Sequence, residues 1–482
     1  MQNLEGREKN FDDFLSSMKE PAEELRKVPA CETIRLISHL DSDGISAAAI
    51  MIRALNRMNR KYALSILQQL DDKQLISLSK EQYKTLIFTD IGSGQLSGIQ
   101  KRLPGRKIFI LDHHEIDRAA SNEDSSIFHI NSHKFGIEGS TEISGAGVVF
   151  FFARELDPKN EEMAHIALIG AIGDIQEEHG FSEINRKIIE IAERKGKVKA
   201  EKGLKLFGAQ TKPIHKLLEQ SSDFFIPGVT GSESGAIQFM QNLGISPRAA
   251  DGGWKKLSAL SDEEMKKLVA GIIITRGQEK KPEEIIGAVY TLVNEKQDSP
   301  LRDAKEFSTL LNACGRMGKA SFGIGACLGD PRAKQQALNT LADYKKEIMK
   351  SLKWYDENSG SKNVIRGNGY LIINAGSSVP ATIIGTMASI ISKSSGISAG
   401  TIIISLAQNF DGSTKVSARV AGREKNALDM RAIVKSITKI SGGEAGGHRN
   451  AAGAVIPTEC EDKFIESARA VLEKLALEEN VF

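Results

Sequence analysis

Hydrophobic and polar positions follow two alternating patterns along the first 195 residues. Short β-branched runs, typical of buried strands, are separated by segments in which apolar residues recur every three or four positions, as in helices. The first pattern predicts strands at residues 33–38, 63–67, 85–89, 107–111 and 127–130. The second predicts helices at residues 45–60, 144–155, 161–172 and 183–194. This alternation is typical of a parallel α/β sheet.

The pattern changes further along the chain. Residues 196–220 are rich in lysine and are predicted to form a connecting helix. A middle insertion follows at 221–353, with helices predicted at 257–268 and 332–353 and strands at 271–275 and 285–292. Residues 363–482 form a second, smaller α/β unit, with strands predicted at 370–374, 401–406 and 414–420 and helices at 381–392, 428–440 and 461–475. The first domain is expected to span residues 1–195 and to open with an amphipathic helix that ends near Pro21.

Composition narrows the class of protein. A chain of 482 residues with 40% hydrophobic and 26% charged residues is expected to form two or three soluble globular domains. The net charge of +2 means that a polyanionic partner would have to be met by a local basic groove. Four scattered cysteines indicate a reduced, intracellular chain. The N-terminus lacks an apolar signal core, and residues 369–392 contain Asn374 and Pro380, so we expect a cytoplasmic protein without a membrane span.

Acidic and imidazole side chains recur where the predicted strands end. His39, Asp41 and Asp43 follow the first strand, Asp90 follows the third, and Asp112-His113-His114 follows the fourth. Asp174 follows the predicted helix at 161–172. An Asp-x-Asp-Gly sequence alone is often only a turn and a helix cap. Residues two apart on a strand share a face, however, and the ends of parallel strands meet at one sheet edge, so these side chains are expected to converge.

The types of these side chains indicate a metal centre. The set contains four carboxylates and two imidazoles, namely His39, Asp41, Asp43, Asp90, His113 and Asp174. It is too acidic for a structural zinc site and richer in nitrogen than calcium or magnesium sites. A pair of borderline divalent ions fits best, with Mn²⁺ preferred and Mg²⁺ as the alternative. Two ions about 3.5–4 Å apart need a bridging carboxylate, and such a pair can promote in-line attack on phosphorus.

With its chain order and spacing, the set resembles motifs I to IV of the DHH phosphoesterase superfamily. The sequence Glu142-Ile143-Ser144-Gly145-Ala146-Gly147-Val148 resembles a helix start found in RecJ-like exonucleases. The resemblance implies that one ion takes His39, Asp41 and Asp90. It implies that the other takes Asp43, Asp90, His113 and Asp174, with Asp90 bridging. Asp112 would orient the ligands, and His114 would face the scissile phosphate.

Two further stretches resemble substrate-binding parts of this superfamily. The pattern Gly-Gly-His-x-x-Ala-Ala-Gly, in a stretch expected to form a glycine-rich turn, resembles the DHHA1 domain and implies contacts from Gly446, Gly447, His448, Arg449, Ala451, Ala452 and Gly453. Arg419 is implied to contact phosphate or ribose. The block 301–330 resembles the middle of archaeal RecJ-like nucleases and implies that Asn312 and Arg316 grip substrate. The alternative for that block is an ordinary helix ended by Gly315, since it lacks the pattern of a P-loop.

The resemblance implies an exonuclease that removes nucleotides 5′ to 3′ from single-stranded DNA, with RNA as a further substrate, in replication or repair. The DHH and DHHA1 domains would form a cleft that admits a single strand better than a duplex. Two alternatives stay open. One is a phosphodiesterase for short RNA or cyclic dinucleotides, and the other is a replisome scaffold that binds the GINS complex or another replication protein through the middle domain.

Overall fold

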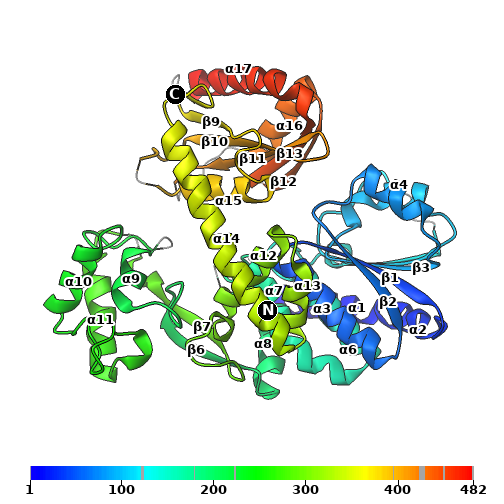
Figure 1. Cartoon of the computed structure of the whole chain (residues 1–482). Coiled ribbons are helices and arrows are strands. Elements are labelled where there is room, and N and C mark those ends of the chain that lie inside the picture. The colour runs from blue at the N-terminus through cyan, green and yellow to red at the C-terminus, as the bar shows by residue number, and fades with distance from the viewer. Residues whose placement is uncertain are drawn as a thin grey trace. The chain divides into compact units, whose positions relative to one another are not determined.

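The computed structural model describes residues 2–120, 124–178, 180–221, 224–279, 281–394, 396–422, 429–448 and 451–479. The chain divides into two compact units, Met1–Leu341 and Ala342–Phe482 (Figure 1), and each is described by itself. None of the described helices combines the length and the apolar character needed to cross a membrane.

A five-stranded sheet organises the N-terminal part of the first unit. Its strand order is β2-β1-β3-β4-β5, and all neighbouring strands are parallel, which confirms the predicted sheet. The strands are β1 (Thr33–His39), β2 (Lys61–Leu67), β3 (Thr85–Thr89), β4 (Lys107–Asp112) and β5 (Ile127–Asn131). Every residue of β3 is buried, because helices cover both faces of the sheet. That burial accounts for the unbroken apolar runs in the sequence.

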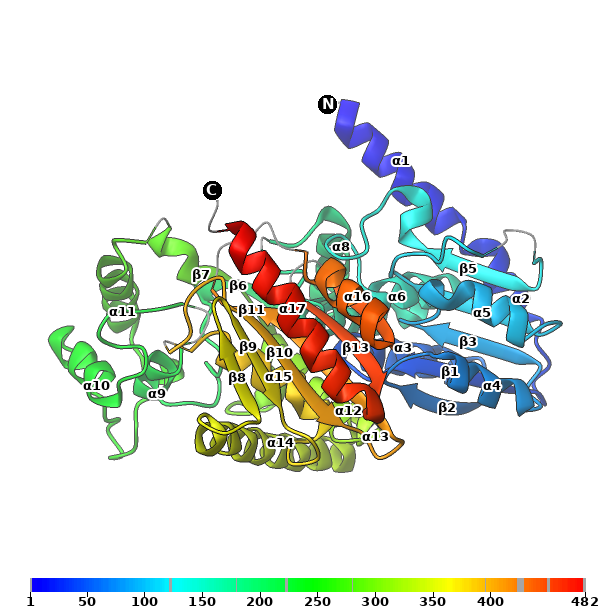
Figure 2. The ribbon, with the colours of Figure 1, turned by 90° about the horizontal axis from the view of Figure 1, so that it is seen from above.

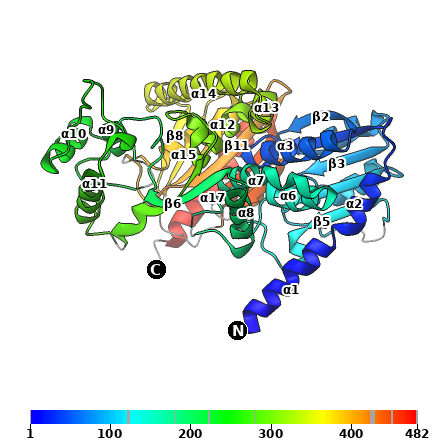
Figure 3. The same ribbon diagram turned by 90° about the horizontal axis from the view of Figure 1, so that it is seen from below.

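Helices lie on both faces of this sheet. On one face are α4 (Asp72–Lys80) and α5 (Leu96–Arg102), which share a core with Leu86 and Phe88 of β3 (Figure 2). The other face carries α3 (Ser42–Arg57) and α6 (Gly145–Leu156). α7 (Ala164–Gly173) packs against both of these helices, and α8 (Glu183–Arg194) packs against α7 (Figure 3).

The N-terminus forms two helices. They are α1 (Gln2–Ser16) and α2 (Lys19–Arg26), so the prediction of one helix ending near Pro21 was wrong. Pro21 lies in the first turn of α2, where a backbone N–H has no partner inside the helix and the missing donor costs nothing. Phe11 of α1 packs edge-on against Phe151 of α6, with ring centroids 5.3 Å apart.

The middle of the chain corrects two predictions. The helix predicted at 196–220 is replaced by β6 (Val198–Leu204), which pairs antiparallel with β7 (Ile286–Leu292), and by the short α9 (Ile214–Glu219). The strand predicted at 271–275 is the end of α11 (Asp262–Thr275). That helix begins with a capping box between Ser261 and Glu264, and its continuation overrides the β preference of the isoleucines. Together with α10 (Glu233–Asn242), these helices enclose their own apolar core.

Three helices follow the middle region. They are α12 (Ala304–Arg316), α13 (Ala320–Cys327) and α14 (Pro331–Asn358), the last of which runs from the first unit into the second. Within the first unit, α12 packs against α7 and α3, the two helices that flank the carboxyl end of β1. A segment distant in sequence is thereby brought to the edge where the acidic residues were predicted to gather.

The second unit has a mixed six-stranded sheet with the order β12-β13-β11-β10-β9-β8. Its strands are β8 (Val364–Gly367), β9 (Tyr370–Asn374), β10 (Ile402–Gln408), β11 (Ser413–Val420), β12 (Glu444–His448) and β13 (Ala451–Pro457). α16 (Met430–Ser441) and α17 (Glu461–Glu479) share a core with one face, and α15 (Ala381–Ile391) covers the other (Figure 1). The glycine-rich turn predicted between residues 442 and 453 lies largely in the paired strands β12 and β13.

Candidate metal centre

His39, Asp41 and Asp43 lie at the junction of β1 and α3. His39 is the last residue of β1, Asp41 is the N-cap of α3 and Asp43 lies in its first turn. The expectation that all three share a strand face was therefore wrong, because the helix begins at Ser42. Asp41 does serve as a helix cap, with one carboxylate oxygen accepting a hydrogen bond from the Gly44 N–H at 3.0 Å. Its other oxygen, Oδ2, lies 2.9 Å from His39 Nδ1.

Asp90 lies between two imidazoles at the end of β3. Its side chain is buried, and neither carboxylate oxygen accepts a hydrogen bond of good geometry from the described residues. Oδ1 is 3.2 Å from His113 Nε2, and Oδ2 is 3.7 Å from His39 Nδ1. The backbone of Asp90 has a φ of 57°, a left-handed conformation uncommon for a residue with a side chain. A buried carboxylate so arranged, without hydrogen-bond donors, is suited to a cation.

Asp43 and Asp174 approach different nitrogens of the His113 ring. Asp43 Oδ2 is 3.7 Å from His113 Nε2, and Asp174 Oδ2 is 3.8 Å from His113 Nδ1. Both oxygens of Asp43 also accept backbone N–H groups at the start of α6, from Gly145 at 2.6 Å and Ala146 at 2.9 Å. The partial positive charge at a helix N-terminus favours such a carboxylate. A Cβ atom on Gly145 would lie 2.4 Å from Asp90 Oδ1, which accounts for the glycine at this position of the Ser-Gly-Ala-Gly-Val sequence.

The electrostatics of the centre call for a cation. Burial, followed by the nearby charge of Asp90, raises the pKa of Asp43 well above its usual range. Burial likewise raises the pKa of Asp174 to about 6, against the opposing effect of His113 and with a further contribution from Asp90. Among the described residues, three groups each have ligand atoms within 4.8 Å of one another. They are His39, Asp41 and Asp90; Asp43, His113 and Asp174; and Asp90, Asp112, His113 and His114. The residues present therefore fit a bound divalent cation.

Asp112 is placed differently from the other carboxylates. Its Oδ2 accepts the Ser93 N–H at 2.8 Å, and its Oδ1 accepts the His113 N–H at 2.8 Å and faces His114 Nδ1 at 2.7 Å. Burial alone would raise the pKa of Asp112, but the neighbouring histidines and these donors hold it below its usual range. The pKa of His114 is raised because Asp112 outweighs the effect of burial. Asp112 thus orients His114, whose side chain is 41% exposed.

Asn131 fixes the positions of Ser93 and His114 through hydrogen bonds. This residue was not identified from the sequence. Its amide Nδ2 donates to Ser93 Oγ at 2.8 Å and to the His114 carbonyl at 2.9 Å. His129, on the same strand, contacts Ser93 Oγ through Nε2 at 2.8 Å, and burial lowers its pKa to about 4. In the sequence, the one signal that could have pointed to Asn131 is its position at the end of a predicted strand. In the structure that strand is β5, and Asn131 lies opposite Asp112.

The helix α12 lies against the loop that carries three of the predicted ligands. Asn312 Oδ1 accepts a hydrogen bond from the Ser42 N–H at 3.0 Å. A Cβ atom on Gly315 would lie 1.6 Å from the Leu40 carbonyl oxygen, so only glycine allows this approach. Arg316, half-buried, lies in the last turn of the helix. Substrate contact by Asn312 and Arg316 stays a prediction, and Asn312 has a structural contact besides.

The predicted binding residues of the second unit gather at one end of its sheet. Arg419 of β11 lies opposite Ala451 of β13, which in turn lies opposite His448 of β12. Arg419 Nε donates to Ser389 Oγ of α15 at 3.1 Å. Gly446 and Gly447 are exposed, while Ala452 is buried and Gly453 half-buried. Arg449 lies outside the described residues, and at His448 only the backbone is described.

Known families match each part of this architecture. The model of the N-terminal domain of the DHH family matches residues 33–172, that of the DHH-CID domain 206–288, and that of the DHHA1 domain 367–474. The chain therefore belongs to the DHH/DHHA1 superfamily, as its motifs predicted. An uncharacterized protein of Methanocaldococcus jannaschii is 28% identical over 443 residues, which are 91% of this chain and 93% of that protein.

Two solved structures share the fold at low sequence identity. CDC45 from Entamoeba histolytica has a TM-score of 0.65 at 12% identity, covering 95% of this chain and 99% of that one. RecJ from Thermus thermophilus, solved with Mn²⁺, has a TM-score of 0.54 at 14% identity over 95% of this chain. The chain spans only 55% of the length of that RecJ.

Proposed function

We propose that this protein is a two-metal-dependent exonuclease that hydrolyses phosphodiester bonds of single-stranded DNA 5′ to 3′, with RNA as a second substrate, in replication or repair. The observation that carries the proposal is the buried carboxylate of Asp90, which lies between His113 and His39 without a hydrogen-bond donor of good geometry among the described residues. A nuclease acting on a phosphodiester uses such a position to bridge two ions.

Each residue of the centre has a role in this proposal. His39, Asp41 and Asp90 hold one divalent ion, and Asp43, Asp90, His113 and Asp174 hold the other, with Mn²⁺ preferred and Mg²⁺ accepted. When bound, the ions supply charge stabilisation and a nucleophile at neutral pH. The Nδ1 of His114 is held by Asp112, which leaves Nε2 to donate to the scissile phosphate.

Substrate binding is assigned to residues outside the metal centre. Arg419 and the glycine-rich hairpin, comprising Gly446, Gly447, His448, Arg449, Ala451, Ala452 and Gly453, would contact the phosphate and sugar of the strand. Asn312 and Arg316 would contact it from α12. Contacts to phosphate and sugar carry no sequence information, which suits an exonuclease.

The test compares end-labelled single-stranded DNA and RNA of several lengths with Mn²⁺ or Mg²⁺. Asp43→Asn and Asp174→Asn should each lower the rate by more than the roughly 10–100-fold loss typical of residues behind metal ligands. Asp157→Asn is the matched control, because Asp157 caps a turn by accepting the Lys159 N–H at 2.9 Å, a role that asparagine retains. Activity of either ligand variant equal to the wild type at saturating Mn²⁺ would contradict the metal-site assignment.

The length series separates the proposal from its enzymatic alternative. An exonuclease shortens long strands one end at a time, whereas a phosphodiesterase for short RNA or cyclic dinucleotides cuts only the shortest substrates. Cleavage confined to dinucleotides would favour that alternative.

A scaffold role is a second candidate, favoured by the likeness of the whole fold to CDC45. The DHH-CID match at 206–288 is the region through which GINS or another replication protein would bind. Partner binding that persists in Asp43→Asn would show that this role is separate from the metal centre.

A further inference from the structure

The amide of Gln176 joins two of the predicted ligands of one metal ion. Its Nε2 donates to Asp174 Oδ2 at 2.9 Å and to the Gly139 carbonyl at 2.9 Å. The same carbonyl is 2.8 Å from His113 Nδ1. Gln176 therefore contacts one ligand directly and the other through a shared carbonyl oxygen. Its side chain is only 5% exposed, so water does not readily replace these bonds.

The Gly139 carbonyl determines which nitrogen of His113 is available to a cation. A carbonyl oxygen can only accept a hydrogen bond, so the proton of a neutral His113 must be on Nδ1. The unprotonated Nε2 then faces Asp90 Oδ1 at 3.2 Å and Asp43 Oδ2 at 3.7 Å, which is the interior of the centre. Second-shell partners fix metal-binding imidazoles in this way.

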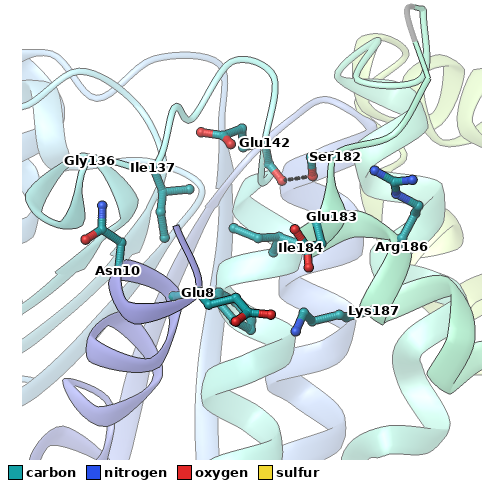
Figure 4. A pocket seen from close by; sticks show the side chains of 11 residues that line it. Glu8, Asn10, Gly136, Ile137, Glu142, Ser182, Glu183, Ile184, Arg186 and Lys187 are labelled. Carbon is teal, nitrogen blue, oxygen red and sulfur yellow. Dashed lines mark hydrogen bonds between the residues drawn. The ribbon is translucent and has the colours of Figure 1, made fainter. Parts of the chain in front are cut away.

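Hydrogen bonds hold the loop that presents this carbonyl. Ser182 Oγ donates to the Glu142 carbonyl at 2.6 Å, which ties the loop to the start of α8 (Figure 4). A pocket of about 260 Å³ opens beside this bond, lined by Glu142 and Ser182 together with Glu8 and Asn10 of α1.

Asn185 of α8 sets the orientation of the Gln176 amide. Its Nδ2 donates to Gln176 Oε1 at 2.8 Å, and its side chain is 1% exposed. With Oε1 facing Asn185, both N–H groups of Gln176 face acceptors. The opposite orientation would place Oε1 against a carboxylate and a carbonyl, two groups that cannot donate.

We infer that Gln176, oriented by Asn185, is a positioning residue that selectively strengthens binding of the ion held by Asp43, Asp90, His113 and Asp174. This inference rests on the proposed function, because it assumes the two-ion assignment. Neither residue contacts His39 or Asp41 through these bonds, so binding of the ion assigned to those ligands should not depend on them.

The test is a titration of the full chain with Mn²⁺. Calorimetry and the electron paramagnetic resonance signal of free Mn²⁺ measure binding, so the test does not depend on catalytic activity. Gln176→Met keeps the size of the side chain but removes both donors. It should raise the dissociation constant of one of two ions by about 10–100-fold and leave the other unchanged. Asn185→Asp keeps nearly the same shape but replaces the amide donor with a carboxylate oxygen, which only accepts. It should weaken binding of the same ion.

The matched control is Asn160→Leu. Asn160 is an equally buried amide that accepts from Arg57 Nη1 at 2.6 Å and donates to the Ala153 carbonyl at 2.7 Å. Its loss should lower the melting temperature and leave both Mn²⁺ constants unchanged. If Gln176→Met does not fold, Asn185→Asp provides the measurement.

The outcomes separate the inference from the function on which it rests. Wild-type protein that binds no Mn²⁺ would overturn both. Two ions in the wild type, with unchanged constants in Gln176→Met or Asn185→Asp, would overturn the inference alone. Equally weakened binding of both ions would also overturn the inference, because the effect would not be selective.

Discussion

Single residues of the centre have protonation states that depend on the cation. Asp43 and Asp174 have raised pKa values because burial and neighbouring carboxylates disfavour their charged forms. His39 and His113 have raised pKa values because nearby aspartates outweigh the effect of burial. At these four side chains, the folded, metal-free protein binds more protons than the unfolded chain does. The stability contributed by these groups therefore falls as pH rises.

This sign leads to a prediction about pH. For Asp174, stability is lost as the pH rises from about 4, the ordinary pKa of the side chain, to about 6, its pKa in the folded protein. A divalent cation requires ionised carboxylates, so its stabilising effect should grow over the same window. Thermal unfolding with Mn²⁺ or with EDTA should show a larger Mn²⁺-dependent rise in melting temperature at pH 7 than at pH 5. In Asp174→Asn this difference should shrink, and a rise independent of pH in the wild type would contradict the interpretation.

Single residues also mark the limit of sequence reasoning at the site. The six predicted ligands could be found because each follows a recognisable apolar run. Gln176, Asn185 and Gly139 follow no such pattern, and their roles depend on which carbonyl or carboxylate the fold places beside them. Asn131 does follow a predicted strand, but it has neither a carboxylate nor an imidazole to mark it as a ligand. Hydrogen bonds between polar residues far apart in sequence leave no periodic signal, so this layer could not be predicted.

At the scale of secondary structure, α12 contacts the loop of the candidate metal centre although it lies far along the chain. Its Asn312 was predicted to grip substrate together with Arg316, yet its Oδ1 accepts the Ser42 N–H beside Asp41 and Asp43. The two residues can therefore have different roles on one helix.

Two substitutions in α12 should separate these roles. Asn312→Ala leaves the Ser42 N–H without this acceptor and should lower the free energy of unfolding by about 1–3 kcal/mol. It should also weaken Mn²⁺ binding, because the loop that carries His39, Asp41 and Asp43 loses a fixed point. Arg316→Ala should raise KM for single-stranded DNA and leave Mn²⁺ binding unchanged. Chemical denaturation, Mn²⁺ titration and steady-state kinetics measure the three quantities, and identical effects of both substitutions would contradict the division.

Helices and strands were predicted where burial gives a local apolar pattern, and they were missed where it does not. The central strands β1, β3 and β4 of the first sheet are buried along most of their length, so their apolar runs identified them. β6 carries Lys199, Glu201 and Lys202 on an exposed two-stranded ribbon, and these good helix formers gave a helical pattern. Its strand conformation depends on pairing with β7, more than 80 residues later, which no local pattern reveals.

At the scale of the whole molecule, the sequence predicted the N-terminal and C-terminal regions more accurately than the middle region. The parallel sheet follows from apolar patterns that are local to each strand, and so do β9, β10 and β11 of the C-terminal sheet. Its strands β8, β12 and β13 were not predicted. The middle region has a core formed by helices and loops around a short ribbon, and there the predicted elements were least accurate. The domain boundaries proposed from the sequence stay a prediction.

The second unit should contribute to binding in the intact chain. Arg419→Ala should weaken the affinity for single-stranded DNA to a similar extent for all sequences, because phosphate contacts carry no sequence information. It should also reduce the slope of log affinity against log salt by about 1. Fluorescence anisotropy at several salt concentrations measures both. Lys463→Ala, an exposed cation on α17, is the control and should change neither. An unchanged salt slope in Arg419→Ala would contradict the assignment of this arginine.

The bond between Asn312 and Ser42 has a consequence for the newly synthesised chain. The two residues are 270 positions apart, so the loop with the first three ligands lacks this bond until most of the chain has left the ribosome. At translation rates of about 5–20 residues per second, the delay is roughly 15–50 s. During that interval an incomplete chain has His39, Asp41 and Asp43 but not this support, so completion of the candidate metal centre is linked in time to the synthesis of a distant helix.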